Sequence, residues 1–214
     1  MLKNLLKKQL ITFATAMLLG SLALSARAEI SAPDTDIKNA VDAVLIVLKQ
    51  DQTDKKKVQT VVDSKVLPLF DFTLMTKRAV GHSWRTATAE QKKTLVNEFR
   101  DLLVRVFIAK AFTENTNRTV KFEPIKVTEE EDQVTVKSLI VGQGKSPIEV
   151  DYDMKKTAAG WKVVDLAIAG PRLALDIYSV QFRDPLQQNG IDGLIKFLSD
   201  KNRAIDTSAP ISRQ

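Results

Sequence analysis

Few side chains in this 214-residue sequence have the types and spacing that covalent chemistry needs. The single histidine, His82, lies in a Gly-His-Ser-Trp turn without an acidic neighbour, which favours a surface histidine over a general base. Asp151 and Asp153 would share one face of a strand, but their alternation with apolar residues favours a solvent-facing position. Cysteine is absent, which excludes disulfides and thiol nucleophiles. We therefore predict no catalytic residue, no metal site and no resident cofactor.

A glycine-rich segment, Gly142-Gln143-Gly144-Lys145-Ser146, resembles the end of a phosphate-binding loop. That motif needs a further glycine five positions before its Gly-Lys-Ser, where this chain has Leu139. The segment also joins two predicted strands, so no helix N-terminus follows it to hold a phosphate. The sequence therefore gives no support for nucleotide binding.

The first 28 residues have the pattern of a cleaved secretory signal peptide. Three lysines precede an apolar run from Leu10 to Leu24, and Ala26-Arg27-Ala28 supplies a small-x-small cleavage site. The full chain carries a net charge of +6. Without the four basic residues of this segment the remainder has 28 basic and 26 acidic side chains, a net charge of +2. So small an excess removes the main argument for nucleic-acid binding, and we predict no nucleic-acid partner.

The rest of the chain divides into a helical part, a strand-rich part and a second helical part. Apolar residues at helical spacing predict helices over 34–49, 54–67, 70–81, 88–115, 171–187 and 191–202. Gly81 fits the end of the third helix, and Thr88-Ala89-Glu90-Gln91 is a capping box that opens the fourth. Residues 204–214 lack apolar periodicity and are predicted to form a mobile tail after a single domain over 29–203.

After Asn115 the period of the apolar residues changes from about four to two. Four strands are predicted, from Val120 to Ile125, Val134 to Ile140, Ile148 to Met154 and Trp161 to Val164. Short polar links between them indicate an antiparallel meander. The predicted fold class is therefore α+β: a curved four-stranded antiparallel sheet packed against several helices.

A series of short motifs spans nearly all of the chain after residue 28. In order they are Phe70-x-Phe72-x-x-Met75, Ala79-Val80-Gly81-x-x-Trp84-Arg85, Gly160-Trp161-Lys162-Val163-x-Asp165, Tyr178-x-x-x-Phe182 and Gly190-x-Asp192-x-Leu194-Ile195. Together they resemble the MlaC family of periplasmic phospholipid-binding proteins, also called toluene-tolerance proteins. The chain departs from the family pattern at Gly170-Pro171-Arg172, where the family usually has Gly-Val-Ser or Gly-Ile-Ser, and at Tyr178-Ser179, where it often has Tyr-Arg.

The resemblance implies a monomeric carrier in the periplasm of a Gram-negative bacterium. Such a carrier moves diacyl phospholipid between an inner-membrane ABC transporter complex and an outer-membrane lipoprotein–porin complex, and so maintains the lipid asymmetry of the outer membrane. The bound phospholipid is cargo, and the protein is not an enzyme. Two acyl chains would need an apolar cavity, which we expect between the sheet and the helices.

Candidate lipid-binding residues come from the inward positions of the strands and the apolar faces of the helices. They are Phe70, Met75, Phe107, Val136, Ile140, Val150, Tyr152, Val163, Tyr178 and Phe182. A strand register shifted by one residue would instead bring in Leu139, Val141, Val164 and Leu166. Candidate cations for the lipid headgroup are Arg172, Arg183 and Lys137.

Two other functions stay open at this point. A binding protein for another small hydrophobic solute would have a cavity too small for two acyl chains. A periplasmic hydrolase would lose its activity when His82 or Asp151 is replaced.

Overall fold

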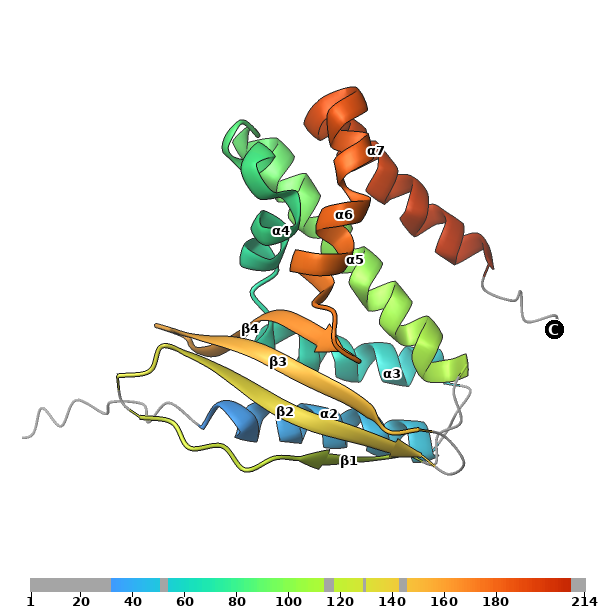
Figure 1. Cartoon of the computed structure of the whole chain (residues 1–214). Helices are drawn as coiled ribbons and strands as arrows, with labels where there is room; N and C mark the ends of the chain where they lie inside the picture. Colours follow the sequence, from blue (N-terminus) through green and yellow to red (C-terminus); the bar gives the residue numbers. More distant parts are fainter. Residues whose placement is uncertain (1–31, 51–53, 114–117, 129, 143–145, 209–214) are drawn as a thin grey trace, which may run out of the picture. The chain divides into compact units, whose positions relative to one another are not determined.

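The computed structural model describes residues 32–50, 54–113, 118–128, 130–142 and 146–208. The predicted signal peptide lies outside these residues, as do residues 209–214 of the predicted tail. Within the described part, helices pack against a four-stranded sheet (Figure 1). This arrangement confirms the predicted α+β class.

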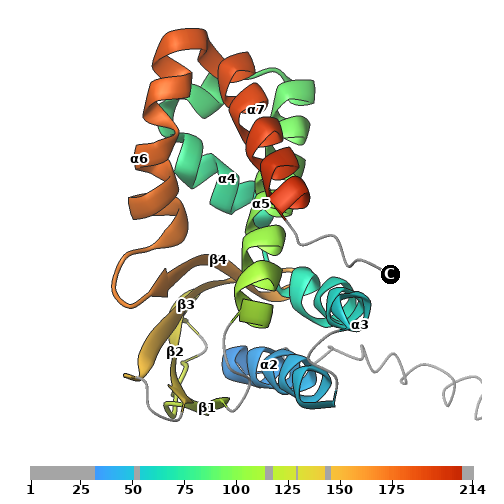
Figure 2. The same ribbon diagram turned by 90° about the vertical axis from the view of Figure 1, so that its right-hand side faces the viewer.

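The sheet is an antiparallel meander in the order β1-β2-β3-β4. Its strands are β1 (Arg118–Phe122), β2 (Gln133–Gly142), β3 (Ile148–Thr157) and β4 (Gly160–Ile168). Figure 2 shows the sheet from its side, where it curves around the helix α2. Short connections explain the order, because antiparallel neighbours can be joined by a turn whereas parallel ones need a long crossover.

The helical segments form two groups, before and after the sheet. The first group is α2 (Pro33–Gln50), α3 (Lys55–Val61), η1 (Val62–Val66), η2 (Leu67–Leu69), α4 (Phe72–Val80), η3 (Gly81–Arg85) and α5 (Ala89–Thr113). The second is η4 (Leu173–Tyr178), α6 (Ser179–Gln181) and α7 (Arg183–Ser208). The views of Figures 1 and 2 agree that α2 lies against the sheet and that α5 and α7 run side by side.

Local side-chain chemistry sets several helix ends where the sequence predicts them. The Thr88 N–H donates to Gln91 Oε1 at 3.0 Å, and the Gln91 N–H donates to Thr88 Oγ1 at 3.2 Å, which completes the capping box before α5. Asp71 caps α4 by accepting from the Leu74 N–H at 2.8 Å. Gly81 ends α4 with a φ of 65°. Any residue with a side chain would be strained in this conformation, whereas glycine is not.

The last helix differs from its prediction at both ends. The predicted helix 171–187 begins only at Leu173 and is divided among η4, α6 and the start of α7. The predicted helix 191–202 is present and is separated from that start only by a kink, where Asn189 and Gly190 have non-helical dihedral angles. The helix then continues to Ser208, so residues 204–208 are helical and not part of a tail. Ile205 packs against the helical core, and this single apolar contact is too little to create a visible period in the sequence.

Strand register decides which side chains share a face. Val136 pairs with Tyr152, Ser138 with Val150 and Ile140 with Ile148, so these alternate residues lie on one face, which we call the inner face because it packs against α2. Lys137 and Leu139 lie on the opposite, outer face. The shifted register, which would have brought in Leu139 and Val141, is therefore wrong for β2.

A β-bulge changes the alternation in β4. Asp153 pairs with Asp165 but Met154 pairs with Val163, so Val164 is the extra residue. Because of the bulge, both Val163 and Leu166 lie on the inner face, although three positions separate them. The sequence alone offered them as alternatives.

Buried apolar residues form separate clusters. The sheet cluster joins the inner face to α2 through Ile37, Val136, Met154, Trp161 and Val163. The helical cluster lies among α4, α5, η4, α6 and α7 and contains an aromatic group, which consists of Phe99, Tyr178, Phe182 and Phe197. Phe70 is partly buried, packs against both clusters and pairs with Val163 of β4.

Candidate functional site

The inner face of the sheet is closed at one end and partly open at the other. At the closed end Val136 and Val163 are fully buried. At the open end Ile140 and Ile148 are partly exposed, and Ile168, which pairs with Val150, is 40% exposed. Large apolar side chains that remain exposed beside a buried apolar surface are typical of a site that a ligand or partner covers.

The structure brings all five predicted strand residues together on this inner face. Val136, Ile140, Val150, Tyr152 and Val163 all lie there, and Phe70 contacts the same cluster. Ile148 and Ile168 also lie on this face but were not predicted from the sequence, and Leu166 was predicted only as an alternative. The period-2 pattern of β3 could have identified Ile148, because it precedes Val150 and Tyr152 in the same series.

The predicted residues on helices lie elsewhere. Met75, Tyr178 and Phe182 belong to the helical cluster, where all three are buried. Phe107 of α5 is 45% exposed. The structure does not bring these four residues into the sheet cluster, so their contact with a ligand stays a prediction.

None of the three predicted headgroup cations lies on the inner face. Lys137 is on the outer face, and Arg183 is exposed at the start of α7. Arg172 Nε lies 2.5 Å from Asp153 Oδ2, so its charge is paired above the outer face. The register instead places Arg118, in series with Val120 and Phe122, at the open end of the inner face. Its alternation with two apolar residues was the signal that could have identified it.

One polar pair interrupts the inner face. Ser138 is 4% exposed, its hydroxyl lies 3.3 Å from the Val150 carbonyl oxygen, and it also hydrogen-bonds the Tyr152 phenol. Burial raises the pKa of the Tyr152 phenol, while the Ser138 hydrogen bond acts in the opposite direction. The phenol is therefore a neutral hydrogen-bonding group within an apolar surface. Phe122 stacks on the Tyr152 ring, with 6.3 Å between the ring centroids.

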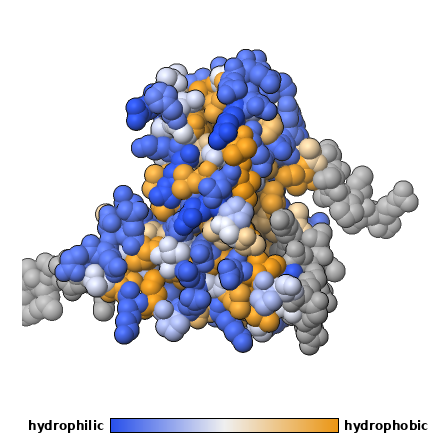
Figure 3. All heavy atoms as spheres, in the orientation of Figure 1, coloured by the Kyte–Doolittle hydropathy of each residue, from blue (hydrophilic) through white to orange (hydrophobic). Residues whose placement is uncertain are grey.

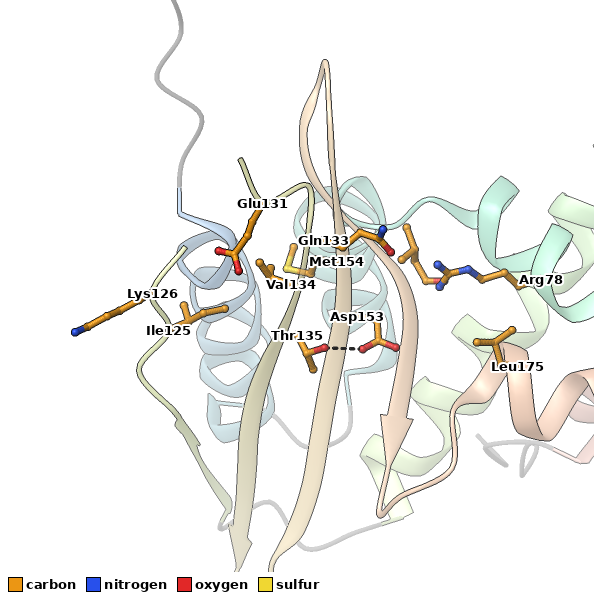
Figure 4. A pocket seen from close by; sticks show the side chains of 11 residues that line it. Arg78, Ile125, Lys126, Glu131, Gln133, Val134, Thr135, Asp153, Met154 and Leu175 are labelled. Atoms are coloured by element: carbon orange, nitrogen blue, oxygen red, sulfur yellow. Dashed lines mark hydrogen bonds between the residues drawn. The ribbon is translucent and has the colours of Figure 1, made fainter. Parts of the chain in front are cut away.

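A cleft of about 550 Å³, shown in Figure 4, borders the inner face beyond Val136. Ile125, Val134 and Met154 of the sheet cluster line it together with charged side chains such as Arg78, Lys126, Glu131 and Asp153. A smaller cleft of about 250 Å³ lies between α5, α6 and α7. The larger cleft is too polar, and the smaller one, which the predicted residue Tyr178 lines with Leu102 and Val106, is too small for two acyl chains. The apolar cavity between sheet and helices therefore stays a prediction.

The outer face of the sheet has a different character. In Figure 3, which views the molecule from that side, hydrophobic and hydrophilic residues are interleaved across the surface. Cross-strand pairs on this face include Lys137 with Asp151 and Thr135 with Asp153, the latter joined by a 2.9 Å hydrogen bond. Among the described residues no group of three or more acidic or histidine side chains is placed to hold a metal ion. No described helix is long and apolar enough to cross a membrane.

A buried carboxylate joins the sheet to the second helical group. Asp165 is inaccessible to solvent, and its oxygens accept hydrogen bonds from the backbone N–H groups of Leu166 (2.8 Å), Ala174 (2.9 Å) and Leu175 (3.2 Å). Burial raises the pKa of Asp165, while these bonds and the nearby Arg78 guanidinium lower it by less. Asp165 therefore fixes η4 to β4 at the expense of a buried charge.

This pKa shift predicts a specific pH dependence. A raised pKa means that the folded protein binds the Asp165 proton more tightly than the unfolded chain does, so its contribution to stability is greatest in acid. That contribution is lost as the pH rises through the raised pKa. We expect the difference in unfolding free energy, wild type minus Asp165→Asn, to decrease with rising pH in urea titrations. A difference that increases with pH would contradict the shift.

Taken together, the fold and the inner face define an α+β binding protein with an apolar surface between a curved sheet and helices. Comparison with known proteins agrees. The family model described as "MlaC protein" matches residues 38–200. The chain belongs to the MlaC family.

Two relatives extend this comparison. The intermembrane phospholipid transport system binding protein MlaC of Haemophilus influenzae is 23% identical over 195 residues, which cover 88% of this chain and 90% of that protein. The solved structure of a phospholipid-binding protein from Ralstonia solanacearum, in complex with a phospholipid, is 32% identical with a TM-score of 0.74. The match covers 82% of this chain and 99% of the Ralstonia chain.

Proposed function

We propose that this protein is a periplasmic carrier of diacyl phospholipid and that the acyl chains bind along the inner face. The observation that carries the proposal is the apolar inner face, closed at one end and open at the other. The same fold occurs in a Ralstonia protein that was solved with a phospholipid bound.

The energetics of transfer agree with a carrier. Each methylene removed from water contributes about 0.8 kcal/mol, so an acyl chain of ordinary length gains on the order of 10 kcal/mol in an apolar site. A lipid therefore cannot cross an aqueous compartment alone at a useful rate, but a protein that shields its chains can carry it. The charged headgroup would stay in water at the open end, where Arg118 lies.

The proposed route joins two membranes. The signal-peptide pattern of residues 1–28 supports a location in the periplasm. There the protein, acting as a monomer, would exchange lipid with an inner-membrane ABC transporter complex and an outer-membrane lipoprotein–porin complex. This exchange would help to maintain the lipid asymmetry of the outer membrane. The name of the Haemophilus relative, which places it in an intermembrane phospholipid transport system, supports this route.

Native mass spectrometry tests the carrier function directly. The full chain is expressed in a Gram-negative host and purified from the periplasmic fraction without detergent. We expect a species heavier than the mature chain by the mass of one or more diacyl phospholipids. Protein that is consistently empty would contradict the proposal, and a bound solute of much lower mass would favour the alternative of a small hydrophobic ligand.

A further inference from the structure

The Ser138–Tyr152 pair is unusual for a surface meant only for hydrocarbon. An apolar face would bind acyl chains without any polar group, and burying hydroxyls in it has a cost unless they are hydrogen-bonded. Here both residues lie on the inner face: Ser138 lies between Val136 and Ile140 on β2, and Tyr152 lies opposite Val136 on β3. Their position suggests a ligand that is polar at one depth and apolar below it.

The hydrogen bonds that this pair can form leave one donor, the Tyr152 phenol, available to such a ligand. Ser138 has a single hydroxyl proton and two acceptors within reach, the Val150 carbonyl oxygen and the Tyr152 phenol oxygen. When Ser138 donates to Val150, the phenol can donate to Ser138, so every proton has an acceptor. When a further acceptor arrives, the phenol can donate to it while Ser138 keeps its own bond. Neither state leaves a buried donor unpaired.

The depth of the pair agrees with one part of a glycerophospholipid. Tyr152 lies two residues from Val150 along β3, a distance of about 7 Å, and Val150 pairs with Ile168 at the open end. With the phosphate in water at that end, the ester carbonyls of the glycerol backbone follow a few bonds below it, and hydrocarbon follows the esters. An ester carbonyl is a neutral acceptor without a proton, which is the complement of a neutral phenol.

We propose that Tyr152 is a positioning and specificity residue that donates a hydrogen bond to an acyl ester carbonyl of the bound lipid, with Ser138 as its partner when the site is empty. This inference rests on the proposed carrier function. It predicts a preference for lipids whose chains are attached by esters over lipids whose chains are attached by ethers, because an ether lacks the carbonyl acceptor.

A competition between matched lipids tests the inference. Full-chain protein, exported and then delipidated, is incubated with vesicles that contain equal amounts of diester and diether phosphatidylethanolamine of the same chain length. The ratio of bound lipids is then read by native mass spectrometry. We expect the wild type to favour the diester about fivefold, the effect of one ordinary hydrogen bond.

Three variants separate a ligand contact from a structural role. Tyr152→Phe should bring the ratio to about one while lipid still binds. Ser138→Ala should keep or increase the preference, because the phenol then has no competing partner. Thr135→Val removes a hydroxyl from the outer face of the same strand and should leave the ratio unchanged.

The outcomes distinguish this inference from the proposed function. A wild type that binds both lipids equally, or a Tyr152→Phe variant that keeps the preference, overturns the inference and leaves phospholipid carriage intact. Equal losses of preference in Tyr152→Phe and Ser138→Ala would indicate a structural pair and also overturn it. A wild type that takes up neither lipid contradicts the carrier function itself.

Discussion

Val150→Trp should lower the phospholipid content of the purified protein by about tenfold while the protein stays folded. Val150 is 6% exposed and lies on the inner face, where it pairs with Ser138 of β2 and with Ile168 of β4. The partly exposed Ile148 of the open end is two residues away on the same strand. An indole at this position would occupy space that the acyl chains need. Displacing two methylenes from the site costs about 1.6 kcal/mol of binding free energy, which corresponds to roughly a tenfold loss.

Folding should survive this change. Overpacking a core position costs about 1–3 kcal/mol, and Ile168, which is 40% exposed, leaves room on one side. Bound lipid per protein is measured by native mass spectrometry, and folding is checked by circular dichroism. Leu139→Trp is the matched control because Leu139 lies on the outer face of the neighbouring strand. Undiminished lipid in Val150→Trp, or an equal loss in the control, would contradict the assignment of the inner face as the lipid site.

The largest loss of stability is expected for Phe99→Ala. Phe99 is fully buried in α5, and its ring makes edge contacts with Tyr178 and Phe182, at centroid distances of 4.9 and 5.4 Å. Truncating a buried phenylalanine costs about 3–5 kcal/mol, because it removes both the apolar burial and these ring contacts. For a domain of this size the unfolding midpoint should fall by about 10 °C.

Phe107→Ala provides the comparison for Phe99→Ala. It makes the same chemical change eight residues along the same helix, at a side chain that is 45% exposed. Thermal unfolding should then show a midpoint within about 2 °C of the wild type. Similar losses in both variants would mean that the aromatic group around Phe99 does not dominate the stability of the helices.

Sequence patterns predicted the elements that depend on local chemistry. The capping box at Thr88 and the terminating Gly81 act through their own backbone neighbours, so they can be identified without tertiary contacts. The same holds for alternation in β2 and β3, which correctly placed Val136 and Tyr152 on one face. Period-2 patterns report a face because each strand carries that information by itself.

Features that depend on a distant partner could not be predicted. The apolar faces that contain Met75 and Phe182 look alike in sequence whether they pack on a sheet or on other helices, and only the fold assigns them to the helical cluster. The bulge that puts both Val163 and Leu166 on the inner face arises from pairing with β3. Arg172 likewise meets Asp153 across nineteen positions of sequence, which no local pattern indicates.

The separation between the helical cluster and the inner face also affects how such a chain can evolve. The most deeply buried aromatic residues lie among the helices, whereas Ile140, Ile148 and Ile168 at the open end are only partly buried. Substitutions at the open end therefore remove little of the free energy that keeps the chain folded. Natural variation can accumulate there and adapt the face to acyl chains of another length or saturation, while the helical half keeps the protein above its stability threshold.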